Sequence, residues 1–210
     1  MKTPALRVST GLLWSCAAVI ALHGLAGCAP LIVGGAVMSG LVAVDRRTSG
    51  AQLEDQSIEL KAINKVREVT GGRGHINITS YNRLLLITGE ASTAADRSAI
   101  EQAVRQIDNV RSTINELAVM EATSLGSRSS DLVITSKVKA SFIDASDLQA
   151  QAVKVVTERG VVHLMGRVTE REAARATEVT RAVGGVQKVV RVFEVISEAE
   201  LAKLQPAAQK

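Results

Sequence analysis

The sequence predicts an α+β protein with two tandem copies of one α-β-β-α-β unit. Each copy is expected to form a mixed three-stranded sheet with two helices on one face. The first observation behind this is an internal repeat, in which a strand, a short turn, a second strand and a glycine occur twice. The second is helical periodicity before and after each strand pair. Because both signals recur in the same order, each half of the chain carries the elements of one small domain.

The strands are predicted from the repeated apolar segments. Residues 76–89 correspond to 153–166, and each segment contains two strands close enough to form an antiparallel hairpin. The third strands lie within 110–119 and 186–195. A helix connects the second strand to the third, and a right-handed crossover of this kind sets the two strands parallel. Each sheet is therefore expected to be mixed.

The helices are predicted from apolar residues at the spacing of a buried helical stripe. Ser57 is the expected N-cap of the first helix, and Ser130 or Asp131 is the expected N-cap of its counterpart. The stripes before the hairpins are Ile58, Ala62 and Val66, and Ile134, Val138 and Phe142; those after the hairpins are Ile100, Ala103 and Ile107, and Ala176, Val179 and Val183.

These elements predict how the chain is divided. The two domains are expected at 57–121 and 131–197, and the polar, glycine-containing segment 122–130 is expected to link them. Residues 28–56 are expected to form a small-residue tether, and 198–210 a C-terminal tail.

Residues 1–27 have the features of a secretory signal peptide. Lys2 and Arg7 supply positive charge, and the apolar stretch that follows ends in Leu-Ala-Gly before Cys28. This ending matches the bacterial lipobox, which predicts cleavage before Cys28 and lipidation of its thiol. The alternatives are an ordinary signal peptide and a membrane-spanning helix that continues to Val44. The proline and glycines after Cys28 disfavour the continuous helix.

Lipidation of Cys28 predicts an anchored protein that faces the periplasm. Cys28 is the one cysteine left after cleavage, and acylation explains an unpaired cysteine in an exported protein. Several acyl chains anchor a protein firmly, because each buried methylene contributes about 0.8 kcal/mol. In the enterobacterial sorting rule, aspartate after the cysteine favours the inner membrane. Ala29 stands there instead, which favours the outer membrane.

Composition disfavours several other classes of function. Without the signal peptide, the chain has 23 basic and 21 acidic side chains and few aromatic residues, so it is not expected to bind nucleic acid. His75 and His163 lie on predicted strands without a nearby cysteine, and we expect both to be solvated or half-buried. No metal site, cofactor or catalytic residue is predicted.

The repeat resembles the BON-domain family. The resemblance rests on the strand with its glycine at 164–168, the Gly185-Val186 pair and segment 45–50. With the lipobox, this order is similar to that of double-BON outer-membrane lipoproteins. The resemblance implies binding of anionic phospholipid, such as phosphatidylglycerol or cardiolipin, by the second domain. It also implies a role in outer-membrane integrity at the division site. The match departs at Val133, where related chains have tryptophan.

The residues themselves point to the same domain. A surface helix is usually polar opposite its core stripe, but the first helix of the second domain is largely apolar there, with basic edges. Residues 57–121 have no net charge, whereas residues 131–196 have ten basic and eight acidic side chains. The predicted lipid-binding residues are Leu132, Val133, Ser136, Lys137, Lys139, Ala140 and Ile143.

Two alternatives remain for this face. Its apolar residues could instead pack against the first domain. The chain could also be a tethered adaptor that uses the face to bind an envelope or division protein, or peptidoglycan. A hydrolytic enzyme is the least favoured class, because chain order alone suggests no serine–histidine–aspartate arrangement.

Overall fold

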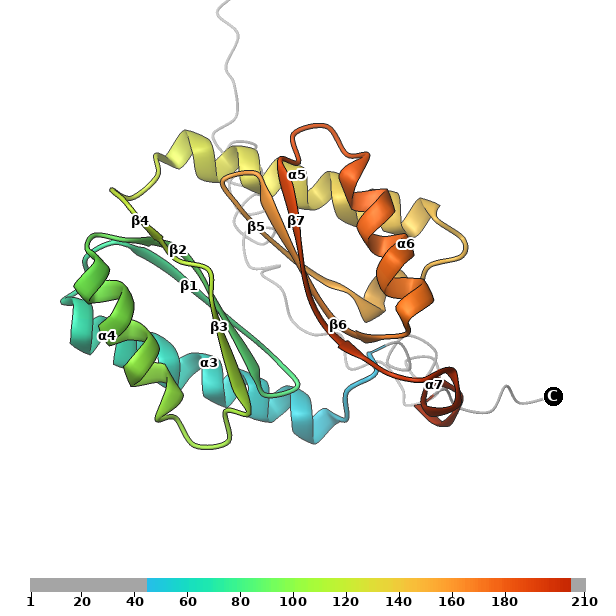
Figure 1. The fold of residues 1–210 in the computed structure, drawn as a ribbon, viewed down its shortest axis with the longest axis horizontal. Helices are drawn as coiled ribbons and strands as arrows, with labels where there is room; N and C mark the ends of the chain where they lie inside the picture. The colour runs from blue at the N-terminus through green and yellow to red at the C-terminus, as the bar shows by residue number, and fades with distance from the viewer. Residues whose placement is uncertain (1–44, 205–210) are drawn as a thin grey trace, which may run out of the picture. The chain divides into compact units, whose positions relative to one another are not determined.

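The computed structural model describes residues 45–204 and contains two successive α-β-β-α-β units (Figure 1). The predicted α+β class, with a mixed sheet in each unit, is confirmed. Cys28, the signal peptide and most of the predicted tether lie outside the described residues. Within 45–204, no helix is long and apolar enough to cross a membrane.

The first unit forms a sheet with β2 at its centre. Its elements are α3 (Ser49–Thr70), β1 (His75–Tyr81), β2 (Leu84–Ala91), α4 (Ala94–Arg105), β3 (Ser112–Asn115) and β4 (Ala118–Val119). Strand β1 is antiparallel to β2, and both β3 and β4 pair with β2 in parallel. The third predicted strand is divided because the Asn115 side-chain oxygen accepts a hydrogen bond from the Leu117 backbone N–H at 3.2 Å.

The second unit repeats this order with an uninterrupted third strand. Its elements are α5 (Leu125–Asp144), the 3-10 turn η1 (Ala150–Ala152), β5 (Lys154–Glu158), β6 (Val161–Val168), α6 (Glu170–Arg181) and β7 (Lys188–Val195). Strand β6 pairs antiparallel with β5 and parallel with β7. The predicted tail begins with a further short helix, α7 (Glu198–Leu204).

The predicted N-caps are wrong, because both long helices begin earlier. Thr48 caps α3 by accepting a hydrogen bond from the Ala51 N–H at 3.1 Å. Ser124 caps α5 by accepting one from the Ser127 N–H at 3.2 Å. Residues 125–130 of the predicted linker are therefore helical. Serines in this turn satisfy their hydroxyls by donating to carbonyls one turn back, which makes a polar segment compatible with a helix.

Two buried aspartates within these helices hold the hairpin turns instead. The Asp131 carboxylate accepts hydrogen bonds from the backbone N–H groups of Arg159 and Gly160, each at 2.8 Å. Asp55 does the same in the first domain, at 2.7 and 2.8 Å. Both turns have positive φ at their two central residues, so neither turn N–H lies in the strand ladder. Each aspartate thus ties its helix to its hairpin.

The repeated glycine is explained by a close approach of backbones. A Cβ atom added to Gly89 would collide with the backbone carbonyl of His75, and one added to Gly166 would collide with that of Ala152. Gly89 also has a φ of 104°, which favours glycine. The repeated glycine therefore marks the place where the second strand of each domain passes unusually close to the neighbouring backbone segment.

Each domain has a core between its sheet and its two helices, which cover one face (Figure 1). The predicted stripes before the hairpins are buried as expected. In the first domain, Ile58, Ala62 and Val66 pack with Leu85 and Ile87 of β2. In the second, Ile134, Val138 and Phe142 pack with Val162 and Leu164 of β6. After the second hairpin, Ala176, Val179 and Val183 join the core as expected. After the first, Ile100 and Ile107 are buried, but Val104 takes the core position expected for Ala103, which is only partly buried.

The opposite faces of the two sheets contact each other along an interface that we call the seam. Its buried apolar residues are Tyr81 and Leu86 from the first domain and Met165 and Val192 from the second. Polar contacts also cross it, such as the hydrogen bond that the Asn82 amide donates to Glu194 at 2.7 Å. The two domains therefore share buried surface as well as a connection in the chain.

Candidate functional site

The predicted lipid-binding residues lie on the outer face of α5. The core stripe of this helix is buried, while Leu132, Val133 and Ile143 have 68%, 53% and 72% of their surface exposed. Ser136, Lys137, Lys139 and Ala140 are exposed beside them. The helix therefore presents apolar side chains to solvent opposite the core.

The alternative that these apolar residues pack against the first domain does not match this structure. Leu132 lines a small cavity that also contains His75 and Ile78 of the first domain, yet most of its side chain remains exposed. Val133 and Ile143 do not line that cavity. A second groove, of about 680 Å³, borders the face where Lys137 and Ala140 approach Val179 of α6.

Sequence reasoning missed Leu125, which extends the same apolar face. It is 78% exposed and lies seven residues before Leu132, about two helical turns away. Leu125 lies in the predicted linker, outside the helix that the apolar spacing predicts. The serines around it hide the helix from a hydrophobicity pattern, but the seven-residue spacing to Leu132 could have revealed it.

The first domain exposes apolar residues too. Leu53 and Leu60 on α3 are 68% and 65% exposed, close to the values on α5. Exposed apolar surface therefore does not separate the two helices. The acidic residues do distinguish the two helices. Helix α3 contains Glu54, Glu59 and Glu68, whereas α5 has only the buried Asp131 before its last residue, Asp144.

Residues 45–47, which we call the clamp, join the start of the folded region to both domains. The Arg46 guanidinium donates to both oxygens of Glu172, at 2.7 and 2.8 Å, and to the Arg167 carbonyl at 2.7 Å. Both side chains of this ion pair are almost completely buried. Burial would raise the pKa of Glu172, but Arg46 and the Thr169 backbone N–H hold the pKa below its ordinary value.

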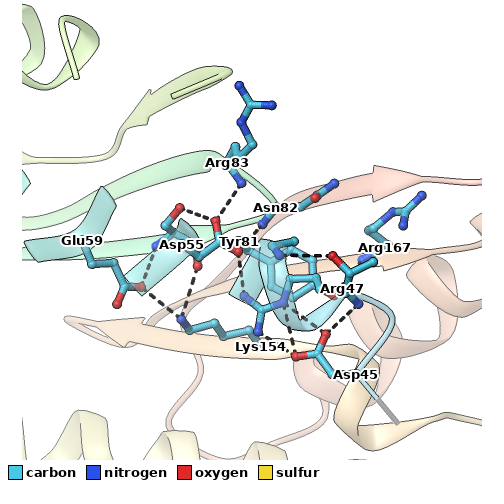
Figure 2. A network of polar contacts seen from close by, with 12 residues as sticks. Asp45, Arg47, Asp55, Glu59, Tyr81, Asn82, Arg83, Lys154 and Arg167 are labelled. Carbon is cyan, nitrogen blue, oxygen red and sulfur yellow. Dashed lines mark hydrogen bonds and ion pairs between the residues drawn. The ribbon is translucent and has the colours of Figure 1, made fainter. Parts of the chain in front are cut away.

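Arg47 of the clamp binds the first domain (Figure 2). Its guanidinium pairs with Asp45 at 2.7 Å and Asp55 at 2.8 Å, and it lies over the Tyr81 ring, 4.3 Å from the ring centre. Asp55 is also the aspartate that holds the β1–β2 turn. Burial raises the pKa of its carboxyl group, but the hydrogen bonds that it accepts lower this pKa by more, so the net pKa is below its ordinary value. Arg46 thus binds the second domain and Arg47 binds the first.

Comparison with known proteins accounts for the repeat. A family model described as "BON domain" matches this chain twice, at residues 55–121 and 130–197. The chain belongs to the BON-domain family. Its two α-β-β-α-β units are BON domains, and the clamp lies just before α3, the first helix of the first unit.

Proteins similar to this double-BON chain include an envelope lipoprotein. The outer membrane lipoprotein DolP of Haemophilus influenzae is 31% identical over 174 residues, which cover 82% of this chain and 90% of that protein. The 21 kDa hemolysin of Actinobacillus pleuropneumoniae is 32% identical over 155 residues, covering 73% and 80%. Osmotically-inducible protein Y of Escherichia coli is 26% identical over 117 residues, covering 54% and 58%.

The second BON domain differs from the expectation in one further residue. His163, expected to be solvated or half-buried, is only 2% exposed, because it points into the seam rather than toward solvent. His75 has about a fifth of its side chain exposed, in agreement with the expectation of partial burial. Both histidines therefore lie near the contact between the two BON domains.

Proposed function

We propose that this protein is an outer-membrane lipoprotein, anchored through Cys28 and facing the periplasm, that binds anionic phospholipid through its second BON domain. Phosphatidylglycerol and cardiolipin are the expected lipids, and the expected role is to support outer-membrane integrity at the division site. The observation that carries the proposal is the outer face of α5, where exposed apolar side chains stand beside Lys137 and Lys139 without an accessible acid until Asp144. The similarity to an outer membrane lipoprotein supports the location.

The chemistry of this face suits the boundary of a bilayer. Leu125, Leu132, Val133 and Ile143 can enter the region between head groups and acyl chains, while the lysine stems extend their charges to the phosphates. Each basic residue near an anionic surface contributes about 1 kcal/mol, so this face alone binds weakly. An acyl anchor on the same chain raises the effective concentration of the domain at the membrane, which makes weak binding sufficient.

The test is sedimentation of the mature chain carrying Cys28→Ser with vesicles of phosphatidylcholine containing phosphatidylglycerol or cardiolipin. Leu132→Asp with Val133→Asp, and separately Lys137→Glu with Lys139→Glu, are expected to weaken binding at least tenfold. Matched controls exist on α3, where Leu53→Asp with Leu60→Asp, and Lys61→Glu with Lys65→Glu, change side chains of similar exposure. These controls are expected to retain binding.

Salt provides a second arm of this test. Attraction to an anionic surface is screened within about 8 Å at physiological ionic strength, so binding should decline as salt increases. Unaltered binding by both α5 variants, or equal losses on α3 and α5, would contradict the proposal. If the wild-type chain binds no vesicles but sediments with peptidoglycan or a division protein, the face serves a tethered adaptor instead.

A further inference from the structure

Three side chains with metal-binding atoms meet where the two BON domains contact each other. His75 comes from β1, Glu90 from β2 and Glu158 from β5, and their ligand atoms all lie within 4.8 Å of one another. The Nδ1 atom of His75 is 3.4 Å from Oε2 of Glu90. Ligands around a tetrahedral zinc ion, each about 2.1 Å from the metal, are themselves about 3.4 Å apart. Two of the three atoms therefore already have the spacing of ligands.

The histidine nitrogen at this place has no other partner. Nδ1 of His75 is buried and makes no hydrogen bond with any residue in the range 45–204. Buried polar atoms are normally hydrogen-bonded, so an exception calls for a ligand or another explanation. Gly89, directly before Glu90, permits the close approach of β1 that places this ring against the carboxylate.

The two carboxylates are held in orientation by neighbours, as metal ligands usually are. Arg159 donates to Oε1 of Glu90 at 2.8 Å, which leaves Oε2 directed toward His75 and the hydroxyl and backbone N–H of Thr123. The Asn77 amide donates to Oε1 of Glu158. These contacts supply the second layer of hydrogen bonds that a site of this kind requires.

The charge balance also favours a cation. Glu90 is fully buried and Glu158 is 5% exposed, and Asp131 is close enough to repel Glu158. Arg159 is the cation paired with Glu90, so the negative charge of Glu158 has no ion-pair partner within 45–204. A divalent ion would compensate for it.

A route to these atoms exists. A cavity of about 370 Å³ reaches His75 and Glu158, and the polar side chains of Asn77, Thr79 and Thr157 line it. A hydrated ion can therefore approach without unfolding of either domain.

We propose that His75, Glu90 and Glu158 form a binding site for a divalent cation of the zinc class, which bridges the two BON domains. One imidazole nitrogen with two carboxylate oxygens suits Zn²⁺ better than Mg²⁺ or Ca²⁺, which prefer sets made only of oxygen ligands. Because the first domain supplies two ligands and the second supplies one, bound metal stabilises the seam. A small movement of Glu158 toward the other two ligands completes a three-ligand site that keeps a position for water.

The experiment uses the chelator-treated mature chain with Cys28→Ser, which removes its one thiol. Calorimetry is expected to show one Zn²⁺ bound per chain. With zinc a hundredfold above Kd, Tm should rise by about 5–10 °C, and Mg²⁺ should leave it unchanged. His75→Gln and Glu158→Gln should each weaken zinc binding at least tenfold and abolish the rise in Tm. The exposed control Glu121→Gln should retain both effects.

A check on folding accompanies these variants. Without metal, Glu158→Gln should melt at or above the wild-type temperature, since it removes a buried negative charge without its own counterion. Absence of zinc binding by the wild-type chain would overturn the proposal. So would undiminished zinc binding by the His75→Gln and Glu158→Gln chains.

Discussion

Among single residues, His163 is a titratable side chain that is almost completely removed from water beside the seam. It is 2% exposed, and neither ring nitrogen has a hydrogen-bond partner within residues 45–204. Burial lowers its pKa, although the Glu116 carboxylate across the seam opposes this effect; Lys188 on β7 reinforces it. The folded state therefore prefers the neutral ring, whereas the unfolded chain takes up a proton near pH 6.5.

The sign of the resulting pH dependence follows directly. Below about pH 6.5 the unfolded state binds more protons than the folded state, so the free energy of unfolding falls as pH decreases. One such group produces a slope of at most about 1.4 kcal/mol per pH unit. We expect urea unfolding between pH 7.5 and 5 to show this loss, and His163→Leu to reduce its slope. An equal slope in both proteins would mean that other groups dominate.

At the scale of elements, a helix and a hairpin in each domain are joined by one buried aspartate. Asp131 accepts hydrogen bonds from two backbone N–H groups of the β5–β6 turn, and Asp55 does so for the β1–β2 turn. The two positions are equivalent in the repeat, so the contact belongs to the BON unit itself.

Removal of this contact should destabilise the second domain. Asp131→Ala leaves two turn N–H groups without their acceptor, and a hydrogen bond to a charged group contributes about 1.5–3 kcal/mol. We expect the free energy of unfolding to fall by about 2–4 kcal/mol in urea titrations, with Asp131→Asn intermediate, because one acceptor oxygen remains. The exposed Asp108→Ala in the first domain serves as the control. A loss no larger than that of the control would refute the role of Asp131.

At the scale of the whole molecule, the clamp joins parts that are far apart in sequence. Arg46 precedes the first BON domain but is paired with Glu172 in the second, 126 residues later. Arg47 is held by Asp55 and Tyr81 of the first domain. The chain that connects the folded region to Cys28 therefore starts from a point fixed to both domains, rather than from a free end of the first.

The Arg46–Glu172 pair should accordingly dominate the stability of this junction. Arg46→Ala leaves a buried carboxylate without its counterion, and breaking a buried pair in this way lowers stability by about 3–5 kcal/mol. Arg105→Ala, which removes an exposed pair with Glu101, should change stability by less than about 1 kcal/mol. The double variant Arg46→Met with Glu172→Gln should recover part of the loss in stability. If Arg46→Ala and Arg105→Ala lower the free energy of unfolding equally in urea titrations, this view is contradicted.

The sequence by itself determined the repeat, the order of helices and strands and the two core stripes. It also determined most of the α5 face. These features depend on periodicity, and a period of two or of 3.6 residues is visible within a short window. Ile134, Val138 and Phe142 could be assigned to the core in this way, and Leu132 and Ile143 to the surface opposite. Leu125 was missed because its surroundings are polar.

The hydrophobic pattern did not report where the long helices begin, because Thr48 and Ser124 cap them through local polar hydrogen bonds. Only the tertiary structure decided which sheet faces meet and what the charged residues hold. His75, Glu90 and Glu158 converge because the two sheets pack together across 83 residues of chain. A repeat predicts the contacts inside each copy but not the contacts between copies. Both copies have the same periodic pattern, and that pattern does not show which of their outer surfaces meet.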